Sequence, residues 1–255
     1  MAPNRPSTFP RLPPAYRLVA ADAGDDTLAR ACAAAATGAE PGTLVWAPRR
    51  DRLDCAIVLS PDRSLVLTRP VLLVGMLGLA GALGGLGPPQ TRVTFGWPDR
   101  VEVNGAAVGG TRFAAPPPAA GAGNDVPAWA VIGAAIDVLG DPDDDAPGRH
   151  PDRTTLREEG FDELDTGLLL ESFSRHLLSW VGRWQEDGFV PVREAWLRHF
   201  TAEEGRMVDL GEEGVLTLTG PDGTQIRREL AQAALEPTWV LPESPRASGV
   251  GGLPL

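Results

Sequence analysis

The cationic chemistry of this chain depends on arginine, because its 23 basic residues other than histidine are all arginines and none is lysine. Arg49, Arg50 and Arg52 lie in one polar segment, and Arg100 and Arg112 flank a glycine-rich stretch. A guanidinium can donate two parallel hydrogen bonds to a carboxylate or a phosphate, but its geometry differs from that of a lysine amine. Any pocket between residues 97 and 110 must therefore act without lysine.

The elements that would position these arginines can be predicted from hydrophobic patterning. Asn104-Gly105 is a hairpin signal between two of the strands. Seven strands are expected, at residues 18–20, 43–46, 54–59, 92–95, 101–104, 107–114 and 129–139, and four helices at residues 25–36, 71–87, 164–187 and 191–200. Residues 207–241 favour a small β unit with a turn at residues 221–223. The pattern predicts an α/β protein.

Composition excludes several classes of protein. A net charge of −11 disfavours general binding to nucleic acid, which needs a basic surface. Residues 71–87 are apolar and uncharged, but they are shorter than a typical membrane span and carry six glycines, so we favour a buried helix over a membrane contact. Cys32 and Cys55 lack metal-ligand spacing and predict free thiols in a reducing cytoplasm. No metal site is predicted.

Three segments, in order and spacing, resemble the catalytic core of the biotin/lipoate protein ligase family. They are residues 96–100 (GWPDR), residues 104–111 (NGAAVGGT) and residues 131–137 (VIGAAID). The family patterns are Lys-Trp-Pro-Asn-Asp, a hairpin ending in Lys-Leu-Ala-Gly-Ile, and Ile-Gly-Ala-Gly-Ile-Asn. The resemblance covers roughly residues 15–241.

The resemblance implies a class II synthetase-like fold, in which helices flank a mixed, mostly antiparallel sheet and a small SH3-like β domain follows. The implied divisions are a flexible arm at 1–14, a catalytic domain at 15–204, a β domain at 205–241 and a mobile tail at 242–255. It also implies that a carboxylate, biotin or a lipoate-type acid, reacts with Mg-ATP to form an acyl-adenylate. An acceptor carrier-protein lysine then takes the acyl group. The oligomeric state is left open.

The resemblance also assigns roles to residues. The catalytic candidates are Arg112 and Arg100. The candidates for binding the nucleotide and the acid are Arg49, Arg50, Arg52, Trp97, Pro98, Asp99, Gly109, Gly110, Thr111, Gly133, Ala134 and Asp137. Glycines at these positions would let the backbone approach the ligand closely. We therefore expect Gly110→Val to abolish ligand binding and leave folding intact.

The sequence departs from the family where the family uses lysine. Gly96 stands at the first lysine position, Ala107 at the catalytic lysine, and Asp137 at an asparagine. The Gly-Arg-Gly-Arg loop that closes over the ligand in the family is shortened to residues 47–53. Two alternatives follow. The first is a divergent ligase whose arginines form an anion site, and the second is a non-catalytic family member whose arginines form surface ion pairs.

Overall fold

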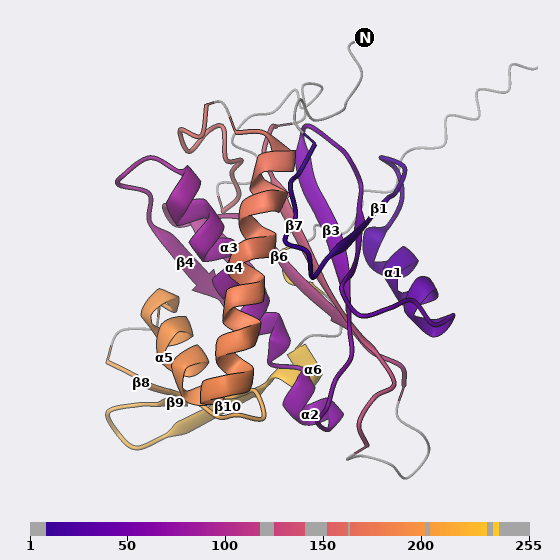
Figure 1. Ribbon diagram of the computed structural model, residues 1–255. Coiled ribbons are helices and arrows are strands. Elements are labelled where there is room, and N and C mark those ends of the chain that lie inside the picture. The colour runs from indigo at the N-terminus through magenta and orange to yellow at the C-terminus, as the bar shows by residue number, and fades with distance from the viewer. Residues whose placement is uncertain are drawn as a thin grey trace, which may run out of the picture.

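The protein is described by a computed structural model at residues 9–117, 125–140, 152–162, 164–201, 205–233 and 237–239. Seven strands form one twisted sheet, in the order β1-β2-β3-β7-β6-β5-β4 (Figure 1). Their bounds are Arg17–Ala20 (β1), Thr43–Trp46 (β2), Arg52–Leu59 (β3), Val93–Gly96 (β4), Arg100–Val103 (β5), Ala106–Ala114 (β6) and Ala130–Asp137 (β7). Only β1 and β2 pair in parallel, so the predicted mixed, mostly antiparallel sheet is confirmed.

Helices cover the two faces of this sheet unequally. α3 (Val71–Leu86) and α4 (Thr166–Asp187) pack on one face, and α5 (Phe189–His199) joins them beside β4 (Figure 1). α1 (Thr27–Ala36) packs on the opposite face, over β2, β3 and β7. The Asp26 side chain caps α1 by accepting from the Leu28 and Ala29 amides.

The glycine-rich helix lies inside the protein. α3 follows the short helix α2 (Leu65–Thr68), and 72% of the most apolar window of residues 65–86 is buried. The length and composition of residues 65–86 alone would allow a membrane crossing. A Cβ at Gly78 would lie 3.2 Å from the Leu177 Cα, and one at Gly81 would lie 2.6 Å from the His176 ring. The glycines therefore let α4 pack closely on α3, as expected for a buried helix.

The predicted hairpin joins β5 to β6. Asn104 and Gly105 have φ values of 52° and 96°, which a two-residue hairpin turn requires. The pairing register shifts between Val101 and Glu102. Just after this irregularity Gly109 has a φ of 145°, where a Cβ would lie 2.1 Å from the Ala135 carbonyl oxygen. Only glycine fits there, so backbone packing between β6 and β7 accounts for Gly109.

A second sheet follows the helices. β8 (Met207–Leu210), β9 (Val215–Thr219) and β10 (Gln225–Glu229) pair antiparallel in the order β10-β9-β8, and α6 (Leu230–Ala233) follows (Figure 1). This confirms a small C-terminal sheet. Residues 1–8 of the predicted arm at 1–14 and the predicted tail at 242–255 lie outside the described residues, and the domain boundaries stay predictions. Within the predicted arm, Leu12 packs against the main core and the Arg11 amide donates to Glu171.

Candidate functional site

Strand register places several predicted site residues on one face of the sheet, the face that carries α1. Arg52 is opposite Asp137, Asp54 is opposite Ala135, and Ala135 is opposite Gly110. Residues directly opposite each other in an antiparallel pair point to the same side of the sheet. The next pairs in register continue the same face: Gly110 with Arg100, and Gly133 with Arg112 and Ala56. Charged side chains therefore surround a floor of glycine and alanine.

The glycines of this floor are in contact with the protein's own residues. A Cβ at Gly133 would lie 3.2 Å from Leu28 Cδ1 on α1. A Cβ at Gly110 would lie 2.1 Å from the Asp99 carbonyl oxygen and 2.5 Å from the Trp239 ring. The first of these Gly110 contacts is to backbone, so the expectation that Gly110→Val leaves folding intact is corrected: a larger side chain would displace β5.

Arg112 lies at the N-terminus of α1, between two carboxylates. Its Nη2 is 3.2 Å from Asp26 and 3.8 Å from Asp54. The Thr27 hydroxyl also donates to Asp54. Burial raises the pKa of Asp54, and the Thr27 hydrogen bond and the Arg112 charge oppose that rise. Arg112 thus stabilises a partly buried carboxylate, and its Nε is buried without an acceptor among the described residues.

A second ion-pair group lies at the end of β7. Asp137 is 3.5 Å from the Arg52 Nη1 and 3.3 Å from the Arg153 Nη2. The Arg52 guanidinium lies over the Trp239 ring, 5.4 Å from its centroid. The Arg52 Nε, like that of Arg112, is buried without an acceptor in the described part of the chain. Asp137 therefore holds two guanidinium groups beside the glycine floor.

Thr238 and Trp239 fill the space over Gly110. The Trp239 side chain is 2% exposed, and its indole N–H donates to the Thr111 carbonyl at 3.3 Å. The Trp239 carbonyl accepts from Arg153 at 2.6 Å. The Thr238 hydroxyl donates to Asp99 Oδ1 at 2.6 Å, and the Thr238 amide donates to the same carboxylate. This segment thus contacts several predicted site residues at once.

Asp99 itself is 2% exposed. Burial raises the pKa of its carboxyl to about 6, and the Thr238 hydrogen bonds and the charge of Arg100 oppose that rise. The Asp99 carbonyl accepts from the Thr111 amide at 3.0 Å. Its side chain is therefore committed to the C-terminal segment rather than open to solvent.

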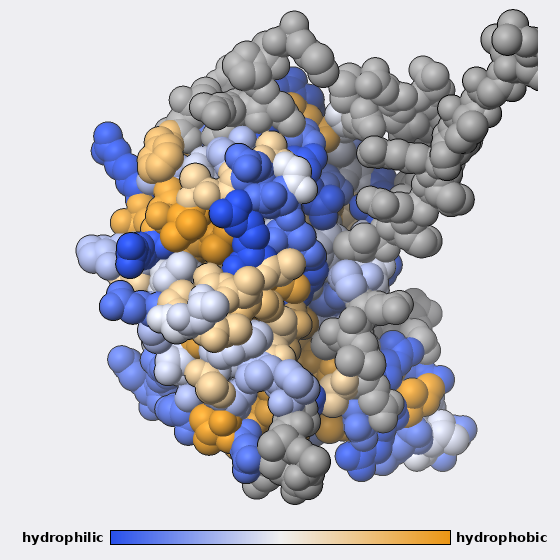
Figure 2. All heavy atoms as spheres, turned by 90° about the vertical axis from the view of Figure 1, so that its right-hand side faces the viewer, coloured by the Kyte–Doolittle hydropathy of each residue, from blue (hydrophilic) through white to orange (hydrophobic). Residues whose placement is uncertain are grey.

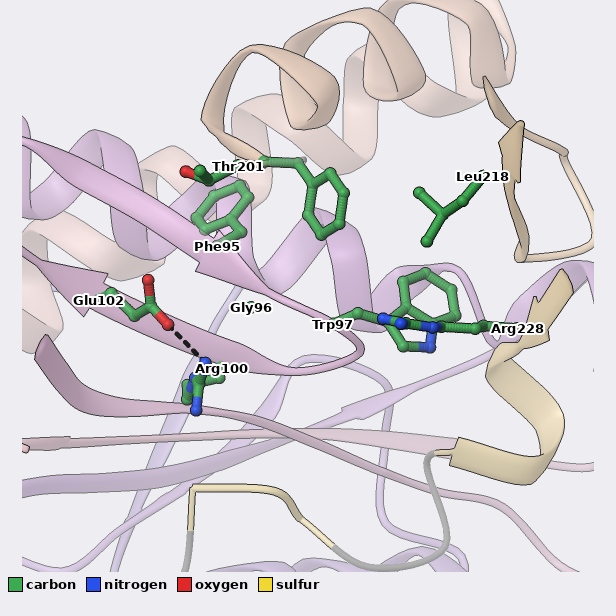
Figure 3. A pocket seen from close by; sticks show the side chains of 9 residues that line it. Phe95, Gly96, Trp97, Arg100, Glu102, Thr201, Leu218 and Arg228 are labelled. Atoms are coloured by element: carbon green, nitrogen blue, oxygen red, sulfur yellow. Dashed lines mark ion pairs between the residues drawn. The ribbon is translucent and has the colours of Figure 1, made fainter. Parts of the chain in front are cut away.

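Trp97 and Arg100 line a different opening. A cavity of about 330 Å³ lies between β4, β5 and the C-terminal sheet, and its lining includes Trp97, Arg100, Glu102 and Arg228 (Figure 3). Arg100 forms an ion pair with Glu102 at 2.7 Å, and its Nε is buried without an acceptor in the described residues. Pro98 is buried after a cis peptide bond. Arg100 is opposite Gly110 in the strand register, but its side chain pairs with Glu102 and lines this cavity.

Other predicted residues take different roles. Arg49 forms an ion pair with Asp51 in the loop between β2 and β3, and Arg50 is exposed in the same loop. The Thr111 side chain donates to the Leu72 carbonyl on α3, and Ala134 belongs to the core on that same side. The side chains of Thr111 and Ala134 point toward α3, so only their backbone atoms could face the α1 side.

Ala107, at the position of the family's catalytic lysine, is buried and makes backbone hydrogen bonds to residues 152 and 154. Ala107 is 4% exposed, its amide donates to the Asp152 carbonyl at 2.8 Å, and its carbonyl accepts from the Thr154 amide at 2.9 Å. No described group of three or more His, Cys, Asp or Glu side chains is placed to hold a metal ion.

Five contributors to this face were missed: Asp26, Asp54, Arg153, Thr238 and Trp239. Asp54 had a usable signal, because it shares a strand face with Arg52 at a spacing of two residues. Asp26 precedes a helix, which indicates a cap rather than a partner for a distant arginine. Nothing local distinguishes Arg153 or residues 238–239.

The face turned toward the viewer in Figure 2, on the α1 side of the molecule, mixes hydrophilic and hydrophobic residues.

Known proteins share both the sequence pattern and the fold. Residues 12–198 match the biotin/lipoate A/B protein ligase family. A relative from Paracoccus denitrificans, called biotin–[acetyl-CoA-carboxylase] ligase, is 30% identical over 185 residues, 67% of this chain and 75% of the relative. A biotin protein ligase-like protein of unknown function from Silicibacter sp. TM1040 superposes with a TM-score of 0.78 at 27% identity, covering 89% of this chain and 100% of that chain.

A biotin protein ligase from Aquifex aeolicus shares the fold, with a TM-score of 0.64 at 16% identity, over 84% of this chain and 99% of that chain. The family match covers most of the chain, and the Paracoccus relative is similar over two thirds of it. The three segments that carry the resemblance all lie within the matched range. On this evidence, the chain belongs to the biotin/lipoate A/B protein ligase family.

Proposed function

We propose that this protein is a ligase that activates a biotin-type or lipoate-type carboxylate with Mg-ATP and transfers the acyl group to a lysine of an acceptor carrier-protein domain. In the first step a carboxylate oxygen attacks the α-phosphate, forming an acyl-adenylate and releasing pyrophosphate. In the second step the lysine amine attacks the acyl carbon and AMP leaves. Family membership supports this proposal, as does an A. aeolicus biotin protein ligase structure that contains biotin and ATP. We place the reaction in the cytoplasm.

One structural observation supports the anionic-ligand part of the proposal. Arg52 and Arg112, which lie beside the glycine floor, each keep a buried Nε–H without an acceptor among the described residues. Buried donors are rarely left unpaired, because an unpaired donor loses its hydrogen bonds to water without replacement. A ligand rich in carboxylate and phosphate oxygens would supply the acceptors. These arginines would then offset the repulsion between the carboxylate and the phosphates that have to meet.

Product detection by mass spectrometry tests the proposal. Purified protein is incubated with Mg-ATP and biotin, lipoate or octanoate in turn, and an acyl-AMP peak above a no-protein control is expected with one of the acids. Arg112→Ala should lower the yield at least about 10-fold, as expected when a group that stabilises transition-state charge is lost. Arg183→Ala is the matched control, because Arg183 is exposed and pairs with Asp187 on α4. No peak from folded protein with any acid would contradict the proposal.

A second candidate is a non-catalytic family member that binds a carboxylate, a nucleotide or an acceptor domain. The observation favouring it is that Arg112 and Arg52 already have carboxylate partners, and that Ala107 and Gly96 replace the family's lysines. An ion-paired guanidinium offers less positive charge to a ligand than a free one. Saturable binding of biotin or ATP without acyl-AMP formation would favour this second candidate.

A further inference from the structure

The segment of residues 237–239 is bound by the site as a ligand would be. Its contacts come from separate parts of the chain: Asp99 before β5, Thr111 on β6, Arg52 on β3 and Arg153 in a loop. The hydrogen bonds are made by the Thr238 hydroxyl and amide, the Trp239 indole N–H and the Trp239 carbonyl, so a few polar contacts hold the segment in the site.

The space that holds Trp239 has a defined chemistry. Its floor is Gly110, whose missing side chain lets the indole ring approach within 2.5 Å of the position a Cβ would take. The Thr111 carbonyl accepts one ring N–H at 3.3 Å, and the Arg52 guanidinium covers a ring face at 5.4 Å. A flat site with one acceptor and a cation over the ring also fits other flat heteroaromatic rings that carry an N–H donor, such as a purine base.

We propose that Trp239 is an internal competitor, which occupies the heteroaromatic-ring site over Gly110 until a nucleotide base displaces it. This proposal depends on the proposed function in one respect, namely that this face of the sheet binds the ligand. The competitor and the base cannot occupy the same space, so the segment must leave when the base binds. The observed affinity for a nucleotide is then reduced by the fraction of molecules in which Trp239 is out of the site.

Two measurements on the whole chain test this displacement. The first is ¹⁹F NMR of protein labelled with 5-fluorotryptophan, in which the Trp239 signal is the one missing from Trp239→Phe. AMP and ATP should shift this signal, and ribose 5-phosphate, which lacks a base, should not. The second is calorimetric titration with AMP. Trp239→Ala should bind AMP at least about 10-fold more tightly than the wild type, because the competitor is gone.

Matched variants separate competition from loss of folding. Trp180→Ala removes a partly exposed tryptophan on α4 that contacts Arg183, away from the site, and should leave AMP affinity unchanged. Thr238→Ala removes one hydrogen bond to Asp99 but keeps the ring, and should bind AMP about 3-fold more tightly, the equivalent of one net hydrogen bond of about 0.7 kcal/mol.

The outcomes distinguish the two proposals. Tighter AMP binding by Trp239→Ala without acyl-AMP formation supports the competitor and contradicts the ligase. Acyl-AMP formation by wild-type protein with an unmoved Trp239 signal supports the ligase and overturns the competitor. Weaker AMP binding by Trp239→Ala also overturns the competitor, because Trp239 would then be a wall of the site. Absence of AMP binding in both proteins overturns it as well, since the space over Gly110 would then be ordinary core.

Discussion

Replacing Gly110 with alanine gives the sharpest test of the site geometry. The new Cβ would lie 2.1 Å from the Asp99 carbonyl oxygen and 2.5 Å from Trp239 Cδ1, where ordinary contacts are about 3.4 Å or longer. The carbonyl cannot move alone, because it accepts from the Thr111 amide at 3.0 Å. Relief therefore requires β5 to shift and the indole to retreat.

The size of the effect follows from these two contacts. Inserting a methyl group into a packed interior costs about 1–3 kcal/mol, and partial loss of Trp239 packing adds to that cost. We expect Gly110→Ala to lower the free energy of unfolding by at least about 2 kcal/mol, which for a chain of this size lowers Tm by about 4–8 °C. Urea denaturation followed by tryptophan fluorescence measures it.

A second glycine provides a control of opposite sign. A Cβ at Gly182, in the middle of α4, would meet nothing within 4 Å. Gly182→Ala should stabilise the protein by about 0.5–1 kcal/mol, because alanine loses less backbone entropy than glycine in a helix. Wild-type stability in Gly110→Ala, with the expected gain in Gly182→Ala, would refute the packing described for the site.

Three further changes have expected outcomes. The pKa of Asp99 is raised to about 6, so the free energy of unfolding of the wild type should fall as pH rises from about 4 to 6. Over that range the stability of Asp99→Asn relative to the wild type, measured by urea denaturation, should increase by at most about 3 kcal/mol. A difference that stays constant with pH would contradict this. Arg112→Ala removes a charged partner of Asp54 and should cost about 1–3 kcal/mol at pH 7, measured in the same way; an unchanged value would show the pair to be unimportant. Burial raises the pKa of the Cys55 thiol, so iodoacetamide at pH 8 should leave Cys55 unmodified until the protein is unfolded; native labelling at Cys55 in peptide mass spectra would contradict its burial.

The elements were largely predictable because their signals are local. Residues 43–46 were predicted as they are observed, and the Asn104-Gly105 turn follows from backbone preferences of two residues. The helix expected from Pro191 begins at Phe189, because proline is tolerated throughout a first turn, where amides need no helical partner. α2 was missed, since its four residues are too few for a periodic pattern.

The site was predictable only as a set of positions. The sequence indicated Gly110 and Gly133 as places of close approach, but it did not show which atoms approach them. Trp239 reaches the Thr111 carbonyl across 128 residues, and Arg153 reaches the Trp239 carbonyl across 86. Contacts at such separations depend on how the whole chain folds, and no local spacing encodes them.

The loss of lysine changes how this face can bind an anion. A lysine amine is a compact point charge, so once it is paired with a carboxylate its charge is largely neutralised. A guanidinium has five N–H donors in a plane. Arg112 contacts both Asp26 and Asp54 through Nη2, so its Nε–H, which has no acceptor among the described residues, can still donate to a ligand. Arginines in existing ion pairs are thus compatible with anion binding through the N–H donors that the carboxylates do not use.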